Sequence, residues 1–115
     1  MADLTKTRTD LIRRAATELG KLVSGQTLEA EDSDTIDGLV DPLIRQLSMN
    51  AVVEIGDVEA IEPEYFLPLA RLLANESAPS FGIPKSADIQ AAEERMLRRL
   101  TATRPTFETL KVDYF

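Results

Sequence analysis

The sequence contains neither cysteine nor histidine. Without cysteine the chain can form no disulfide and offers no thiolate to a metal ion. Without histidine it lacks the side chain that most often serves as a general base or binds a transition metal. No apolar run reaches the roughly 20 residues that a membrane-spanning helix needs, and the first residues lack the apolar core of a secretory signal. We therefore expect a protein that folds in the cytoplasm and does not associate with a membrane.

Motifs for catalysis and ligand binding are also missing. The five glycines occur singly rather than in a phosphate-binding loop, and no histidine is present to activate a serine. The segment from Asp32 to Gly38 begins like a calcium loop, but Asp37 stands where the loop needs glycine and Leu43 where it needs glutamate. We expect no enzymatic activity, no cofactor and no metal site.

Helical periodicity fills most of the 115 residues, a length typical of one domain. Four segments place their apolar residues on one helical face, beginning near Thr7, Ala30, Pro63 and Ser86. The third segment is the most apolar, so we expect it to be the central core helix. In the fourth, the residues expected to face the core are Ile89, Ala92, Met96 and Leu100. The pattern predicts an all-α fold, a small bundle of about four helices over residues 1–103.

Residues 104–115 follow a different period. Leu110, Val112 and Tyr114 alternate there with three polar residues, Thr109, Lys111 and Asp113, which is the pattern of a strand. A strand without a partner in its own chain offers free N–H and C=O groups and one apolar face to another protein. We therefore predict an extended C-terminal arm that binds a partner through Phe107, Leu110, Val112, Tyr114 and Phe115.

The net charge of −7 is unevenly distributed. The segment from Gln26 to Glu64 holds eleven acidic residues and a single basic one, Arg45. Such a surface either keeps the protein soluble or faces a negatively charged molecule that it must not bind. Direct DNA binding through it is not expected, because phosphate contacts require lysine and arginine. Its candidate residues, for a channel wall or a subunit contact, are Glu31, Asp32, Asp34 and Asp37.

The fourth helical segment carries a basic patch made of Arg95, Arg98 and Arg99. Three interpretations remain open for it. The arginines can be a solvated helix end that suits the negative end of the helix dipole. They can contact nucleic acid, or they can contact the acidic segment of a neighbouring copy. Repeated head-to-tail contacts of the last kind close into a ring when the rotation between copies allows it.

Several local features follow one another in a recognisable order. A Thr7-Arg-Thr-Asp-Leu-Ile helix start leads to Leu19-Gly20, Gly25-Gln26 and Glu31-Asp32. Ile61-Glu-Pro-Glu-Tyr-Phe then opens a long helix that closes at Pro79-Ser-Phe-Gly, and an aliphatic-aromatic tail ends the chain. This order, from about Thr7 to Phe115, resembles that of the head-to-tail adaptor proteins of tailed bacteriophages, in particular the tail accessory factors of short-tailed phages.

The resemblance implies a structural protein of the virion neck, assembled in the host cytoplasm. Such adaptors form a ring, usually of twelve copies, beneath the portal protein, and this ring extends the DNA channel and docks tail or nozzle proteins. Packaged DNA would pass through without specific binding. The arm from Arg104 to Phe115 would reach the portal, although some short-tailed relatives have much longer C-terminal regions. A lytic activity occurs in some members, but no residues here supply it.

A different class of function remains as the alternative. A helical regulatory module could bind a protein partner or nucleic acid through Arg95, Arg98 and Arg99. Retention on DNA that falls steeply with salt would favour this alternative, because released counterions make phosphate binding salt-dependent.

Overall fold

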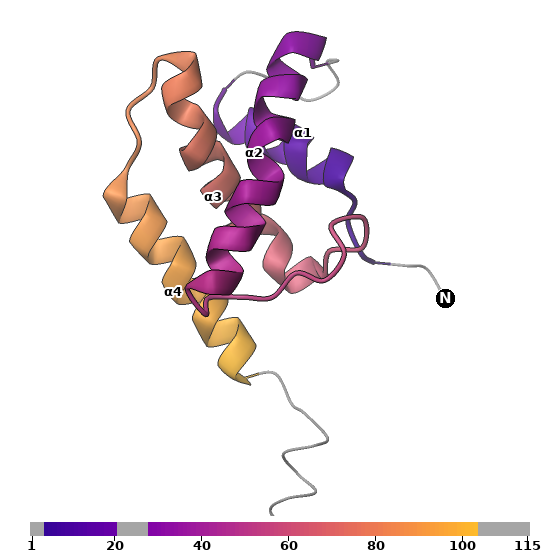
Figure 1. The fold of residues 1–115 in the computed structure, drawn as a ribbon, viewed down its shortest axis with the longest axis vertical. Helices are drawn as coiled ribbons and strands as arrows, with labels where there is room; N and C mark the ends of the chain where they lie inside the picture. The colour runs from indigo at the N-terminus through magenta and orange to yellow at the C-terminus, as the bar shows by residue number, and fades with distance from the viewer. Residues whose placement is uncertain (1–3, 21–27, 104–115) are drawn as a thin grey trace, which may run out of the picture.

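The computed structural model describes residues 4–20 and 28–103, which form four α-helices and one short 3₁₀ turn. In chain order these are α1 (Arg8–Glu18), α2 (Ala30–Met49), α3 (Pro63–Ser77), the turn η1 (Ala78–Phe81) and α4 (Ala87–Thr103) (Figure 1). The described residues contain no strand, only an isolated bridge between Lys6 and Ile61. The predicted small all-α bundle is therefore confirmed, while the predicted arm at residues 104–115 lies outside the described residues.

Helix α1 begins directly after Thr7, where its sequence predicts, and ends at Glu18. The Thr7 hydroxyl accepts a hydrogen bond from the Asp10 backbone N–H (3.2 Å), and the Asp10 carboxylate accepts one from the Thr7 N–H (3.0 Å). This capping box satisfies two N–H groups that the helix itself leaves without partners. After Glu18 the chain turns at Gly20, whose φ of 77° lies in the left-handed region that glycine adopts without strain.

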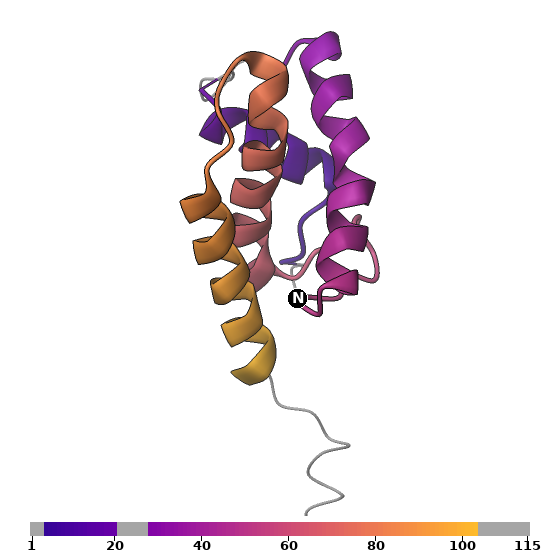
Figure 2. The ribbon, with the colours of Figure 1, turned by 60° about the vertical axis from the view of Figure 1, so that its left-hand side comes forward.

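Helix α3 lies at the centre of the bundle and packs against α1, α2 and α4. Figure 2 shows it between α4 on one side and α2 on the other. Its start has proline in the first turn, where the missing N–H is not needed. The prediction that this segment is the core helix is confirmed, because its buried residues cover most of its circumference: Tyr65, Pro68, Leu69, Ala70, Leu72, Leu73, Ala74, Asn75 and Ser77.

Helix α2 covers one side of α3 with a single apolar stripe, formed by Ile36, Val40, Leu43 and Leu47. It ends in a left-handed turn at Ala51, whose φ is 57°. The Ala51 N–H donates to the Ser48 carbonyl and the Val52 N–H to the Leu47 carbonyl. These two bonds make a Schellman motif, which turns the chain back so that Val52 and Val53 are buried.

Helix α4 is rotated relative to the sequence prediction. Leu97 is fully buried in the core and Leu100 packs partly against it, whereas Ile89 and Met96 are 44% and 40% exposed and Ala92 is also exposed. The predicted inner face was therefore wrong for Ile89, Ala92 and Met96. Apolar residues lie on two faces of this helix, and the contact with α3 selects the face that contains Leu97.

The described part of the chain has no helix that combines the length and the apolar character needed to cross a bilayer.

Candidate interaction surfaces

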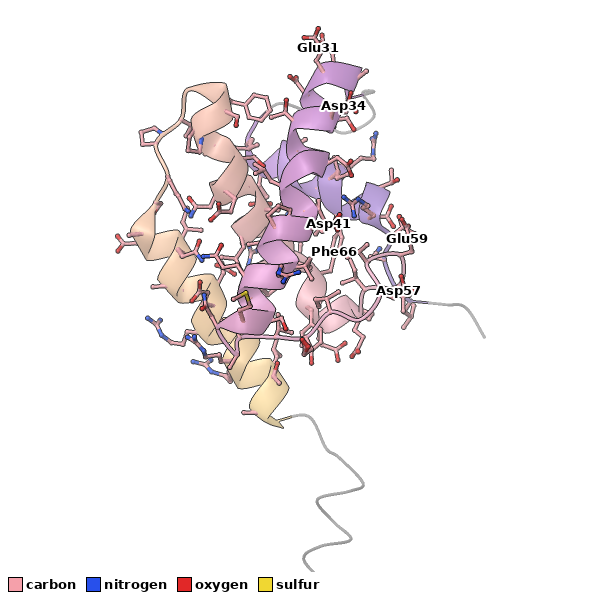
Figure 3. The ribbon with its side chains drawn as sticks, in the orientation of Figure 1. Glu31, Asp34, Asp41, Asp57, Glu59 and Phe66 are labelled. Atoms are coloured by element: carbon pink, nitrogen blue, oxygen red, sulfur yellow. The ribbon has the colours of Figure 1, made fainter. Side chains whose placement is uncertain are left out.

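Acidic side chains gather over α2 and the loop before α3. The predicted residues Glu31 and Asp34 are exposed near the start of α2, and Asp32 and Asp37 are partly exposed. Three further acidic residues are exposed on the same side of the molecule, although the sequence did not predict them as site residues: Asp41, Asp57 and Glu59 (Figure 3). We call the side chains labelled there, namely Glu31, Asp34, Asp41, Asp57 and Glu59, the acidic surface.

Asp37 differs from its predicted neighbours because its carboxylate is already bound within the chain. Arg8 donates from Nε to Asp37 Oδ1 (2.6 Å) and from Nη1 to Asp41 Oδ1 (2.9 Å), while its Nη2 donates to the Asp37 carbonyl (3.1 Å). The hydrogen bonds to Asp41 and Asp37 raise the pKa of Arg8. Asp37 therefore links α1 to α2 through Arg8. Carboxylates that are more exposed to another molecule, such as Glu31 and Asp34, lie nearer the start of α2.

The three predicted arginines lie together on the second half of α4. Arg95, Arg98 and Arg99 are all exposed. Arg98 Nη1 lies 3.9 Å from Oε1 of Glu94, one helical turn earlier, and Arg98 Nη2 donates to the Asn50 carbonyl (3.4 Å). Arg98 thus contacts the C-terminal end of α2. The acidic surface lies on the earlier turns of α2 and in the loop before α3 (Figure 3), and α3 lies between α4 and most of α2 (Figure 2).

The predicted portal-binding residues Phe107, Leu110, Val112, Tyr114 and Phe115 lie outside the described residues. The helix that precedes them ends at Thr103 after two exposed residues, Thr101 and Ala102.

A first groove, of about 230 Å³, lies where the end of α1, the second half of α3 and the start of α4 meet. Its apolar lining is Leu19, Ala74, Ala78, Ile83, Pro84 and Ile89. Asn75 closes its floor, because Nδ2 donates to the Ser86 carbonyl (3.0 Å) and Oδ1 accepts from the Ser86 N–H (2.8 Å). No local pattern predicts this groove, since its walls come from three separate segments.

A second groove, of about 450 Å³, runs along the outer side of α2 and the start of the following loop. Its apolar residues are Ile44, Met49 and Ile55, and its charged residues are Asp41, Arg45 and Glu54. The Ser48 hydroxyl donates to the Glu54 carboxylate, which fixes that acid beside α2. We call this second groove the α2 groove.

Within residues 4–20 and 28–103, no group of three or more acidic, histidine or cysteine side chains is placed to hold a metal ion. No protein-family model matches the chain. No curated protein and no solved structure matches it either. The arrangement of charge and apolar surface is therefore the basis for assigning a function.

Proposed function

We propose that this chain is a head-to-tail adaptor of a tailed bacteriophage or prophage. Copies of it would form a ring beneath the portal protein, in the neck of the virion, where the ring extends the DNA channel and docks tail or nozzle proteins. The role is structural rather than enzymatic, and twelve is the number of copies that the resemblance implies.

The observation that carries the proposal is the separation of charge across a small helical domain. Exposed arginines lie on α4, and the acidic surface lies on α2 and the loop before α3, on the other side of α3 (Figures 2 and 3). A molecule with one positive and one negative side associates with its own copies head to tail, because each contact joins unlike charges. Contacts of this type generate closed rings when the rotation per subunit divides a full turn.

The acidic surface also suits the wall of a DNA channel. DNA binding depends on lysine and arginine that neutralise phosphates. Carboxylates such as Glu31, Asp34 and Asp57 instead repel the duplex. A lumen lined in part by these residues would let packaged DNA slide without holding it.

The arm would supply the attachment to the portal. In an extended segment, Leu110, Val112 and Tyr114 would place three apolar side chains on one face. Each gives roughly 1.5–3 kcal/mol when fully buried, but ordering the backbone costs about 1–2 kcal/mol per residue. One arm alone is thus a weak binder, whereas the arms of a ring dock in succession at high effective concentration.

The test is to mix the purified chain with the portal protein encoded in the same gene neighbourhood and to measure sedimentation. We expect a complex in which the chain adds a ring to the portal, and we expect deletion of Lys111–Phe115 to abolish it while the circular dichroism of the helices stays unchanged. The matched control replaces Thr109 and Asp113, on the polar face of the arm, by alanine and should still bind. Portal binding that survives the deletion would show that the arm assignment is wrong.

One feature favours the alternative of a regulatory module, namely the exposure of Arg95, Arg98 and Arg99 on a single helix. Such a module would be retained on a DNA column at low salt and released steeply as salt rises. The adaptor should pass through the column at every salt concentration, so this measurement separates the two functions.

A further inference from the structure

Helix α4 carries an apolar stripe that the rest of the described chain covers only in part, since Ile89 is 44% and Met96 40% exposed. Ile89, Ala92 and Met96 are spaced three and four residues apart, so they lie on one helical face. Ile89 also lines the first groove beside Ala74 of α3, and Met96 directly precedes the buried Leu97. The stripe therefore lies about 100° around α4 from the side that packs on α3. Arg95 and Arg99 follow Ala92 and Met96 by three residues and therefore border the same stripe. Such a helix face is a docking surface for a groove of suitable chemistry.

The α2 groove has the complementary chemistry. Its apolar residues Ile44, Met49 and Ile55 match the apolar stripe, and Met49 is 77% exposed in the isolated chain. Asp41 and Glu54 supply two negative charges beside them, and Arg45 supplies one positive charge. Asp41 shares the charge of Arg8 with Asp37, so three carboxylates stand against two arginines in and around the groove. An arginine-bordered apolar helix face is attracted to a groove of this composition and is disfavoured by a basic one.

The positions of the two surfaces make the contact intermolecular. Helices α2 and α4 flank α3 (Figure 2), and Arg98 marks the side of α4 turned toward α2, because it donates to the Asn50 carbonyl at the end of α2. Met96 lies two positions before Arg98, about 200° around the helix, so the stripe faces away from α2 within one copy. A copy cannot place its own stripe in its own α2 groove. Two copies can do so with the stripe of one meeting the groove of the other, either reciprocally in a two-fold dimer or head to tail as in a ring.

We propose that the Ile89–Ala92–Met96 stripe of one copy binds in the α2 groove of a second copy, with Arg95 beside Asp41 and Glu54. The proposal rests on the proposed function in one respect, since it names the subunit contact that a ring of adaptors would repeat. Its evidence is separate from the arm and from the portal, because it uses only described residues of the helical domain.

Disulfide trapping tests the contact directly, because the natural chain has no cysteine. Met96→Cys and Met49→Cys variants, one of them tagged, are mixed at low salt under mild oxidation without portal protein. We expect the mixed Met96–Met49 disulfide dimer to be the main product. Each cysteine is placed in a different chain, so no disulfide within one chain competes.

Ser80→Cys, at an exposed position in η1 outside both surfaces, replaces Met96→Cys in the control mixture. We expect it to give several-fold less dimer with Met49→Cys. A mixed dimer no more abundant than this control would overturn the proposal. So would a predominance of Met96→Cys homodimers, since that product would mean that α4 packs on α4.

Charge reversal supplies the second measurement. Adding Arg95→Glu to the Met96→Cys chain should lower the yield of mixed dimer by about fivefold, as expected when one charge pair across an interface becomes repulsive. Adding Glu54→Arg to the Met49→Cys chain should restore much of that yield. No loss, or a loss without restoration, would contradict the charge pairing.

These outcomes are independent of portal binding. Deleting the arm should leave the disulfide trapping unchanged, and Arg95→Glu should leave the binding of a single arm to the portal unchanged. Failure of the subunit contact is thereby distinguished from failure of the adaptor function.

Discussion

Arg8 joins the first turn of α1 to the middle of α2, because its guanidinium donates to the Asp37 side chain over 2.6 Å and also reaches the Asp37 carbonyl. The two residues are 29 positions apart in the sequence. Arg8 is only 21% exposed, and Asp41 accepts a further bond from it. A planar guanidinium makes these three bonds at once, which a lysine ammonium cannot do with the same geometry.

Replacing Arg8 by lysine should lower the free energy of unfolding by about 1 kcal/mol, since the charge is kept but the bonds to both acids cannot be made together. Urea denaturation followed by circular dichroism measures this difference. Arg45→Lys, at an exposed position of α2 outside this network, is the matched control and should change stability by less than about 0.5 kcal/mol. Equal effects at the two positions would show that the Arg8 network adds no stability.

The hydrogen bonds of Arg8 to Asp41 and Asp37 also determine how its contribution to stability depends on pH. The acids raise the folded-state pKa of Arg8 above its ordinary value, with Asp41 as the larger cause. The associated stability is fully present below the unfolded-state pKa and is lost only as the pH rises through the folded-state pKa. The difference in unfolding free energy between the natural chain and Arg8→Lys should therefore stay constant from about pH 6 to about pH 9. A difference that changes across this window would have to come from another group.

Asn75 is buried on α3 and holds the chain before α4 through two hydrogen bonds to the backbone of Ser86. Asn75→Ala should lower stability by about 2–3 kcal/mol, because it leaves partly buried backbone groups without partners. Ser86→Ala keeps both backbone bonds and removes only the hydroxyl that caps the Ile89 N–H, so it should cost about 1 kcal/mol. Thermal unfolding of both variants checks the order, and a reversed order would contradict the assigned role of Asn75.

The rotation of α4 is tested by two neighbouring residues. Leu97→Ala should lower the free energy of unfolding by about 2–5 kcal/mol, because it opens a cavity in the core. Met96→Ala should cost less than about 0.5 kcal/mol in the isolated chain, because Met96 is on the exposed face. Equilibrium unfolding at low protein concentration measures both. A larger cost for Met96→Ala would mean that the originally expected inner face is the true one.

Ala51 holds the left-handed position that ends α2, with φ of 57°. An L-residue is strained there by roughly 1–2 kcal/mol, whereas glycine is not strained but loses more conformational freedom on folding. Ala51→Gly should therefore raise stability by up to about 1 kcal/mol. In the control, Ala91→Gly on an exposed position of α4 should lower it by about 1 kcal/mol. Destabilisation by both glycines to the same extent would exclude strain at Ala51.

The features that the sequence predicts correctly are those encoded locally. The capping box at Thr7 and Asp10, the turn at Gly20 and the proline at the start of α3 each depend on residues a few positions apart. Helix α3 was also predictable as the core, because apolar residues occupy nearly all of its faces. Such signals identify helices and their ends without knowledge of their neighbours.

Features that depend on which helices meet were not predictable in the same way. Both Leu97 and Met96 fit an apolar stripe on α4, and only the position of α3 decides which of them is buried. The bonds from Arg8 to Asp37 and from Asn75 to Ser86 join residues that no short pattern connects. The clustering of Arg95, Arg98 and Arg99 follows from helical spacing, but their separation from the acidic surface depends on how α2 and α4 pack around α3.

The bridge between Lys6 and Ile61 has a mechanical consequence. Two hydrogen bonds join the segment before α1 to Ile61, two residues before α3. The Lys6 N–H donates to the Ile61 carbonyl (2.8 Å), and the Ile61 N–H donates to the Lys6 carbonyl (2.7 Å). The Lys6 ammonium also lies 5.6 Å from the centre of the Phe66 ring. A pulling force applied to the chain before Lys6 is therefore transmitted to α3 as well as to α1. The two Lys6–Ile61 hydrogen bonds must break before such a force can separate α1 from the bundle.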